Sequence, residues 1–199
     1  MKIKILKTVL LFAVILFFNC SNNDDSIEQD QLPPITQTGA NTFGCVVNGK
    51  VLIPKDALPS LGGPQSSARR GLSVNYHSNN NFVIYAGNFR GENKPNIYIY
   101  INNLTSTGTY SFGLSNGESI STFEPTYPHC WIKPFSIAVN GQKYLSNTNS
   151  GIVTITKFDS VNNIISGTFQ LTAFDENNPR ETIEVTNGRF DFNLNTVNN

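Results

Sequence analysis

Gly113-Leu114-Ser115-Asn116-Gly117 matches the G-x-S-x-G pattern that surrounds the nucleophile of many serine esterases. His129 follows in the chain and could act as the base, but the sequence places no acid beside it. The pattern also requires a helix after the serine, whereas residues 118–128 are rich in Ser, Thr and Pro. The sequence therefore favours a turn with an exposed serine over a serine esterase, and it predicts no catalytic residue.

Metal-binding side chains are present, but their spacing is uninformative. Cys45, Cys130, His77 and His129 show neither CxxC nor HxxxH spacing, so no metal site and no cofactor are predicted. Residues 175–178, Asp-Glu-Asn-Asn, group oxygen ligands of the kind that Ca²⁺ accepts. Polar residues before a proline are equally typical of an ordinary hairpin turn, and the sequence favours that interpretation.

Three tyrosines could form a binding surface. Tyr98 and Tyr100 alternate with isoleucines and therefore share one face of a strand, and Tyr85 on an adjacent expected strand could join them. Flat aromatic rings with a polar tip suit a ligand platform for sugars, which makes glycan capture the second functional hypothesis. The alternative is that the tyrosines cover the outer face of a sheet or build a second core.

Cys20 closes an N-terminal signal. Three lysines, Lys2, Lys4 and Lys7, precede an apolar run over residues 9–18, which is too short to cross a bilayer. The end of the run resembles a lipobox, although Asn19 stands where a small residue is usual. The sequence predicts a lipoprotein signal peptide over residues 1–19 and lipidation at Cys20.

The segment after Cys20 predicts a flexible, acidic tether over residues 20–38. It contains four acidic residues, no basic residue and the pair Pro33-Pro34, so it has too little apolar surface to fold alone. Its acidic start resembles an export signal for the outer face of the outer membrane. We therefore expect a surface-exposed lipid anchor in the outer membrane, with a periplasm-facing anchor as the alternative.

The size and charge of the remaining chain limit its domain number and its expected partners. Residues 39–199 are long enough for a single domain with its own core. Removal of the three signal lysines from the 14 basic residues leaves 11 against 14 acidic ones, so nucleic acid is not an expected partner. Cys45 and Cys130 then remain as an even pair in an exported protein and could form a disulfide; the alternative is two buried free thiols.

Alternating apolar and polar residues predict strands almost throughout. The clearest expected strands are residues 81–89, 96–102, 151–158, 164–174, 181–186 and 189–194. Asn-Gly pairs at 48–49, 140–141 and 187–188 have strand-like flanks and predict hairpins. The expected fold is all-β, a single antiparallel β-sandwich of about ten short strands with two long loops, 54–71 and 113–134, or alternatively a lipocalin-like β-barrel.

Three stretches resemble a family of small Bacteroidetes lipoproteins catalogued as a domain of unknown function. They are residues 38–49, which contain Thr-Gly-Ala-Asn-Thr-Phe-Gly-Cys, residues 165–169 and residues 186–191. The resemblance implies an extracytoplasmic, β-rich lipoprotein and transfers no catalytic or ligand-binding residue. The leading hypothesis is thus a non-enzymatic, lipid-anchored β domain that binds a glycan or an envelope protein, or that serves envelope assembly.

Overall fold

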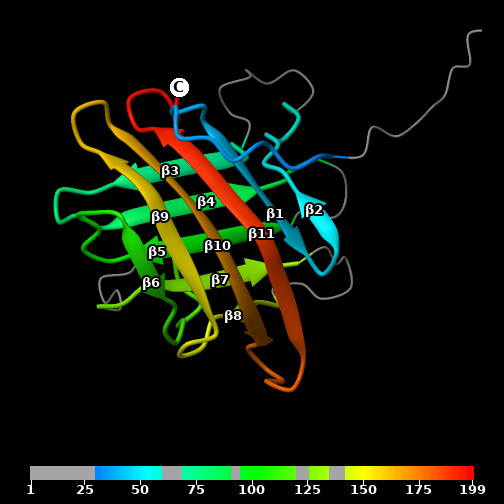
Figure 1. The fold of residues 1–199 in the computed structure, drawn as a ribbon. Coiled ribbons are helices and arrows are strands. Elements are labelled where there is room, and N and C mark those ends of the chain that lie inside the picture. The colour runs from blue at the N-terminus through cyan, green and yellow to red at the C-terminus, as the bar shows by residue number, and fades with distance from the viewer. Residues whose placement is uncertain (1–29, 60–68, 91–94, 120–125, 135–141) are drawn as a thin grey trace, which may run out of the picture.

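The structure, a computed structural model, describes residues 30–59, 69–90, 95–119, 126–134 and 142–199. Within these ranges the protein contains strands and no helix (Figure 1). The predicted signal peptide, Cys20 and the expected hairpin at Asn140-Gly141 lie outside the described residues. The expected all-β, antiparallel fold is confirmed, as a curled sheet that is consistent with either a sandwich or a barrel.

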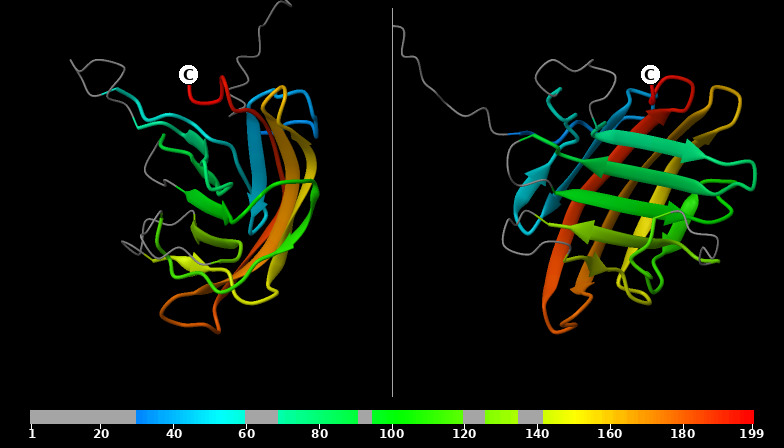
Figure 2. Two further views of the ribbon diagram at one scale, coloured as in Figure 1. Left: turned by 90° about the vertical axis from the view of Figure 1, so that its left-hand side faces the viewer. Right: turned by 180° about the vertical axis from the view of Figure 1, so that it is seen from behind.

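Eleven strands form one sheet that curls into two facing layers (Figure 2). The first layer, in spatial order, consists of β2 (Lys50–Leu52), β1 (Thr42–Val47), β11 (Thr182–Asn193), β10 (Ile164–Asp175), β9 (Gly151–Asp159) and β6 (Gly108–Ser111). The second layer consists of β3 (Leu72–Tyr76), β4 (Phe82–Gly87), β5 (Asn96–Ile101), β7 (His129–Lys133) and β8 (Tyr144–Leu145). All strand pairings that build the two layers are antiparallel.

The two layers are continuous because β10 belongs to both. Its residues pair with β9 on one side and with β11 on the other. At its last two positions it pairs with β8, where Phe174 lies opposite Leu145 and Asp175 opposite Tyr144. The layers are therefore joined at the end of β10, and they face each other along the rest of its length.

The main core fills the space between the layers. Ile97, Ile99 and Ile101 point into it from β5, as the alternation predicts, and all three are fully buried. Phe82 of β4 reaches across to β11, with ring centroids 6.1 Å from Phe190 and 6.5 Å from Phe192. Burial of such side chains contributes about 1.5–3 kcal/mol each, so this cross-layer contact is a major source of stability.

The hairpin predicted at Asn48-Gly49 is confirmed. These two residues join β1 to β2 with positive φ angles of 44° and 78°, and Val47 pairs with Lys50. Positive φ at both positions gives the twist that a two-residue hairpin needs, which Asn and Gly supply at low cost.

The hairpin predicted at Asn187-Gly188 is wrong. Asn187 has a positive φ of 53°, but the chain continues as one strand, β11, and its register against β10 shifts at this point. The dipeptide forms a β-bulge, which bends a strand without ending it. The chain does not reverse at Asn187 because β10, with its twelve residues, pairs with β11 both before and after the bulge.

The second long loop is shorter than expected. Within the predicted loop 113–134, the residues His129–Lys133 form β7 between β5 and β8. Cys130 and Ile132 face the main core, while Trp131 faces the opposite side of the layer. The cluster His129-Cys130-Trp131 is therefore part of the sheet rather than of a loop.

Residues 30–40, called the N-terminal strap here, lie against the first layer. Asp30 forms an ion pair of 2.6 Å with Lys55, and Arg189 of β11 donates a hydrogen bond of 3.3 Å to the Pro33 carbonyl oxygen. The segment expected to be a free tether up to residue 38 thus contacts the domain from residue 30 onward.

The buried carboxylate of Asp191 on β11 holds the strap. It accepts hydrogen bonds of between 2.7 and 3.3 Å from the side chains of Thr36, Thr38 and Ser166 and from the backbone amides of Thr38, Gly39 and Ala40. Burial alone would raise the pKa of Asp191, but the hydrogen bonds outweigh it and hold the pKa below its ordinary range. The buried carboxylate is therefore charged, and hydrogen bonds from the protein replace those that water would make to it.

We expect Asp191→Asn to lower the free energy of unfolding at pH 7 by about 2–4 kcal/mol, because the amide nitrogen cannot accept a hydrogen bond. The folded-state pKa lies below the unfolded value of about 3.9, so this stabilisation is complete above about pH 4 and is lost as the pH falls further. Urea titrations at pH 7 and pH 3 measure both effects. Glu184→Gln, an exposed change on the same strand, is the control. An equal loss in both variants would contradict the assignment.

Candidate functional site

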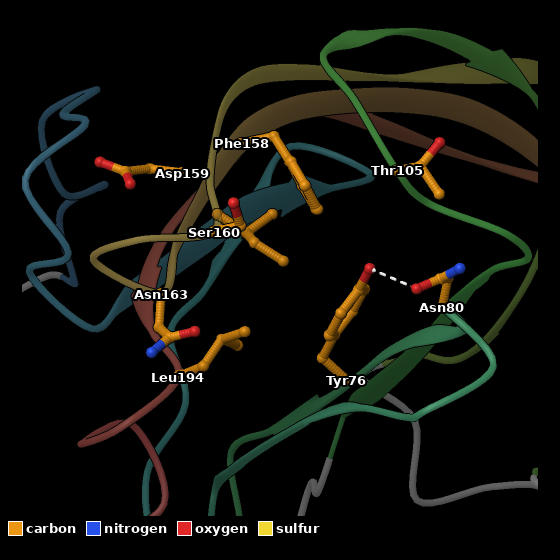
Figure 3. Close-up of a pocket in the computed structure, with 9 residues that line it drawn as sticks. Tyr76, Asn80, Thr105, Phe158, Asp159, Ser160, Asn163 and Leu194 are labelled. Atoms are coloured by element: carbon orange, nitrogen blue, oxygen red, sulfur yellow. Dashed lines mark hydrogen bonds between the residues drawn. The ribbon is translucent and has the colours of Figure 1, made fainter.

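The candidate site is a cavity of about 380 Å³, called the mouth pocket here, at the start of β10. It lies between the two layers at the opposite end of β10 from the pairing with β8. Its walls come from β3, β9, β10, the turn after β3, the β9–β10 turn, the loop after β5 and the residue after β11. They are Tyr76, Asn80, Thr105, Phe158, Asp159, Ser160, Asn163, Ile165 and Leu194 (Figure 3).

The floor and facing walls of the mouth pocket are apolar. Tyr76 of β3 and Phe158 of β9 approach across the layers edge to face, with ring centroids 6.1 Å apart. Ile165 is buried and Leu194 is half-buried against the same core. Figure 3 shows Tyr76 and Phe158, from opposite layers, directed toward one another. The pocket therefore offers two aromatic and two branched aliphatic surfaces to a ligand.

Most of the rim of the mouth pocket is polar and uncharged. Asn80, Thr105, Ser160 and Asn163 bring amides and hydroxyls to it. The hydroxyl of Tyr76 donates to the Leu104 carbonyl oxygen at 2.7 Å and lies 3.1 Å from Asn80 Oδ1. Burial, with Tyr110 nearby, raises the pKa of Tyr76, so the hydroxyl is neutral at physiological pH.

Asp159 lines the pocket, but its carboxylate accepts hydrogen bonds from the turn that follows it. One oxygen accepts the amides of Val161 at 3.1 Å and Asn162 at 2.9 Å, and the other accepts Asn162 Nδ2 at 2.8 Å. The Asn162 side chain and amide hold the pKa of Asp159 below its ordinary value. Figure 3 shows the carboxylate directed away from the space between Phe158 and Tyr76. The carboxylate thus shapes the β9–β10 turn.

The sequence did not identify the mouth pocket. A usable signal was present in residues 159–163, Asp-Ser-Val-Asn-Asn, because Asp accepts amides two and three residues later and Asn tolerates positive φ. Asn80 and Asn163 both have positive φ, 61° and 56°, in the turns that border the pocket. The pattern predicts the turns, but only the packing of β3 against β9 shows that they face each other.

The predicted tyrosine platform is wrong as an exposed surface. Tyr98 and Tyr100 are 1% and 2% exposed and form a second core with Val83 and Trp131. Tyr98 stacks on Trp131, with ring centroids 5.7 Å apart and an interplanar angle of 11°. The outer face of this layer is therefore buried, which is the alternative that the sequence left open.

Tyr85, the third platform residue, is half-buried beside this second core. The guanidinium of Arg69 lies 5.5 Å from the Tyr85 ring centroid and donates a hydrogen bond to its hydroxyl. Burial raises the pKa of Tyr85, and the contact with Arg69 opposes that rise. The ring is covered by a cation and does not present a free face.

Ser115 and His129 meet in the structure, although the sequence favoured an exposed serine. Ser115 Oγ lies 3.1 Å from His129 Nδ1, and the Gly117 amide donates to the same oxygen at 3.2 Å. Both side chains are buried, and the imidazole lies against the rings of Tyr98 and Tyr100, at 5.7 and 5.2 Å. The contact fixes residues 113–117 against β7.

Cys45 and Cys130 are free thiols in the structure, buried in the same core cluster. Burial raises the pKa of Cys45 to about 12. Burial and the neighbouring Cys45 raise the pKa of Cys130 as well. Of the two alternatives from the sequence, the structure contains the buried thiols, and both are neutral at physiological pH.

Asp175 forms the ordinary hairpin turn that the sequence favoured over a calcium site. Its carboxylate accepts the amides of Asn177 at 2.7 Å and Asn178 at 2.9 Å. In the part of the chain that the structure describes, no three His, Cys, Asp or Glu side chains group as a metal ion would require. In the same residues no helix is long and apolar enough to span a membrane.

The fold and the mouth pocket define an all-β domain with a cavity of ligand size between two layers. A family described as a domain of unknown function, DUF6252, matches residues 70–192, and the chain belongs to this family. The match includes two of the stretches that resemble such a family, residues 165–169 and 186–191, and begins after the third. No curated protein and no solved structure gives a significant match.

We expect the domain to lose stability between about pH 6.5 and pH 4 because of His129. Burial lowers the pKa of His129 to about 4, so over this interval the unfolded chain binds a proton that the folded protein does not. The effect reaches about 3 kcal/mol at pH 4. Urea titrations across this range should give a flatter profile for His129→Asn than for the wild type. An unchanged slope in the His129→Asn variant would contradict the assignment.

Proposed function

We propose that the protein is a lipid-anchored, non-enzymatic β domain that binds a small molecule in the mouth pocket. The pocket itself is the observation that carries the proposal. Its volume of about 380 Å³ falls within the range of roughly 300–1,000 Å³ that small-molecule sites occupy. Apolar walls with a few polar groups at the rim are the usual lining of such sites.

The rigidity of the lining supports the same function. The Tyr76 hydroxyl is held by the Leu104 carbonyl oxygen, and the β9–β10 turn is held by the Asp159 carboxylate. Side chains fixed in this way lose little conformational entropy when a ligand binds. The lining of the pocket is therefore preorganised, and its conformation does not depend on a bound ligand.

The proposed anchor follows from the N-terminal sequence. A signal peptide over residues 1–19 would leave Cys20 as the lipidated first residue, and the acidic segment after it supports export to the outer face of the outer membrane. A periplasm-facing anchor is the alternative. The N-terminal strap is compatible with such an anchor. It holds residues 30–40 against the domain, beginning with the ion pair of Asp30 and Lys55, so residues 21–29 would link the lipid to the domain.

We expect a side chain that fills the mouth pocket to abolish ligand binding. Leu194→Trp fills it from the wall and Ser160→Trp from the rim, while Val161→Trp adds the same ring at an adjacent position that is 86% exposed and outside the lining. Saturation-transfer NMR with a mixture of small single-ring compounds should detect binding to the wild type and the Val161 variant. Loss of signal in both filled variants is expected. The proposed function would be contradicted if no compound bound the wild type, or if the Leu194 and Ser160 variants folded and still bound as the wild type does.

We expect Cys20→Ala to move the protein from the membrane fraction to the soluble extracytoplasmic fraction, because the acyl chains supply the anchor. Fractionation together with radioactive palmitate labelling measures both properties. Cys45→Ala is the control for loss of a cysteine. Unlabelled wild-type protein, or a Cys20 variant that stays in the membrane, would contradict the anchor. Digestion by protease on intact cells distinguishes surface exposure from a periplasm-facing anchor.

A further inference from the structure

We propose that the mouth pocket selects an uncharged ligand, an aromatic ring that carries one neutral hydrogen-bonding group such as a hydroxyl or an amide. This rests on the proposed function and specifies its ligand class. Three properties of the pocket support this ligand class. The charged groups next to the pocket are engaged with other parts of the protein, its two aromatic rings meet edge to face, and its rim carries neutral polar groups.

The charged groups next to the pocket are engaged with other parts of the protein. Both oxygens of Asp159 accept hydrogen bonds from the β9–β10 turn. Lys157 Nζ donates to the Gln37 carbonyl oxygen at 3.0 Å and lies 3.7 Å from Asp159. The lining residues themselves include no basic side chain. An ionic ligand would therefore lose water on entry and meet no partner of opposite charge that is not already engaged, which is costly.

The apolar walls suit a ring. Tyr76 and Phe158 meet edge to face, with an interplanar angle of 64°. Aromatic rings prefer such tilted or offset neighbours, and each pair adds to the stabilisation that burial of its area gives. A ligand ring can join the two as a third member, while Ile165 and Leu194 cover its other side. A flexible chain would bury similar area but would lose more conformational entropy.

The rim suits a neutral group that both donates and accepts hydrogen bonds. The Tyr76 hydroxyl donates its one proton within the protein, to the Leu104 carbonyl oxygen or to Asn80 Oδ1, so its oxygen can accept a hydrogen bond from a ligand. Thr105 and Ser160 carry hydroxyls that donate or accept, and Asn163 carries an amide with both functions. A ligand hydroxyl or amide matches these groups, whereas a carboxylate only accepts and an ammonium only donates.

Three probes of the same ring test the charge selection: benzyl alcohol, benzoate and benzylammonium at pH 7. Dissociation constants from NMR chemical-shift titrations of the full mature chain rank them. We expect benzyl alcohol to bind at least about fivefold more tightly than either ion, with shifts confined to residues of the mouth pocket. Benzoate or benzylammonium binding as tightly as the alcohol would overturn the selection and leave the proposed function standing. Failure of all three, and of the mixed single-ring compounds above, would overturn both.

Charge variants of the rim give the second readout. Thr105 is exposed, so it accepts substitution without disturbing the core. Thr105→Asp should raise the affinity for benzylammonium about threefold, and Thr105→Lys should do the same for benzoate, because a rim charge acts through partly screened solvent. Thr182→Asp and Thr182→Lys place the same charges at an exposed position at the other end of the first layer and should leave the affinity for each ion unchanged. Unchanged affinities of the two ions for the Thr105 variants would overturn the placement of the ligand in this pocket.

Discussion

Strand β10 is the constraint on which the architecture depends. Because it pairs with β9, β11 and β8, it makes one continuous sheet out of two facing layers. The layers meet where Phe174 and Asp175 pair with β8 and separate toward Ile164, the first residue of the strand. Side chains fill the space near the joint and leave the mouth pocket at the far end. The position of the pocket thus follows from where the chain closes the sheet.

Much of the fold could be predicted because strand patterns are local. The alternation of isoleucines and tyrosines in β5 assigned each set to the correct face. Tyr98 packs against Trp131 of β7 on the second face of the layer, and the two residues are far apart in the chain, so burial of the tyrosines was not predictable from their own strand. The mouth pocket was missed for the same reason, since Tyr76 and Phe158 meet only through long-range packing.

Asparagine explains both a success and an error. Every non-glycine residue with positive φ in the described part of the chain is an asparagine, which tolerates this region better than other side chains. The abundance of Asn therefore has a conformational use in turns, including those of Asn80 and Asn163 beside the pocket. The same dipeptide forms a hairpin at Asn48 and a bulge at Asn187 because the neighbouring strand, and not the pair itself, decides whether the chain reverses.

The N-terminal strap determines how the domain would carry mechanical load. A pull on the chain from its N-terminal side, where the proposed anchor lies, would reach Asp30 and Lys55 first and then the hydrogen bonds at Asp191. Asp191 lies on β11, which is flanked by β1 and β10, so the force would enter the interior of a layer and not peel away an edge strand. The chain from Cys20 to residue 30 spans at most about 35 Å, which would keep the domain close to the proposed anchor under tension.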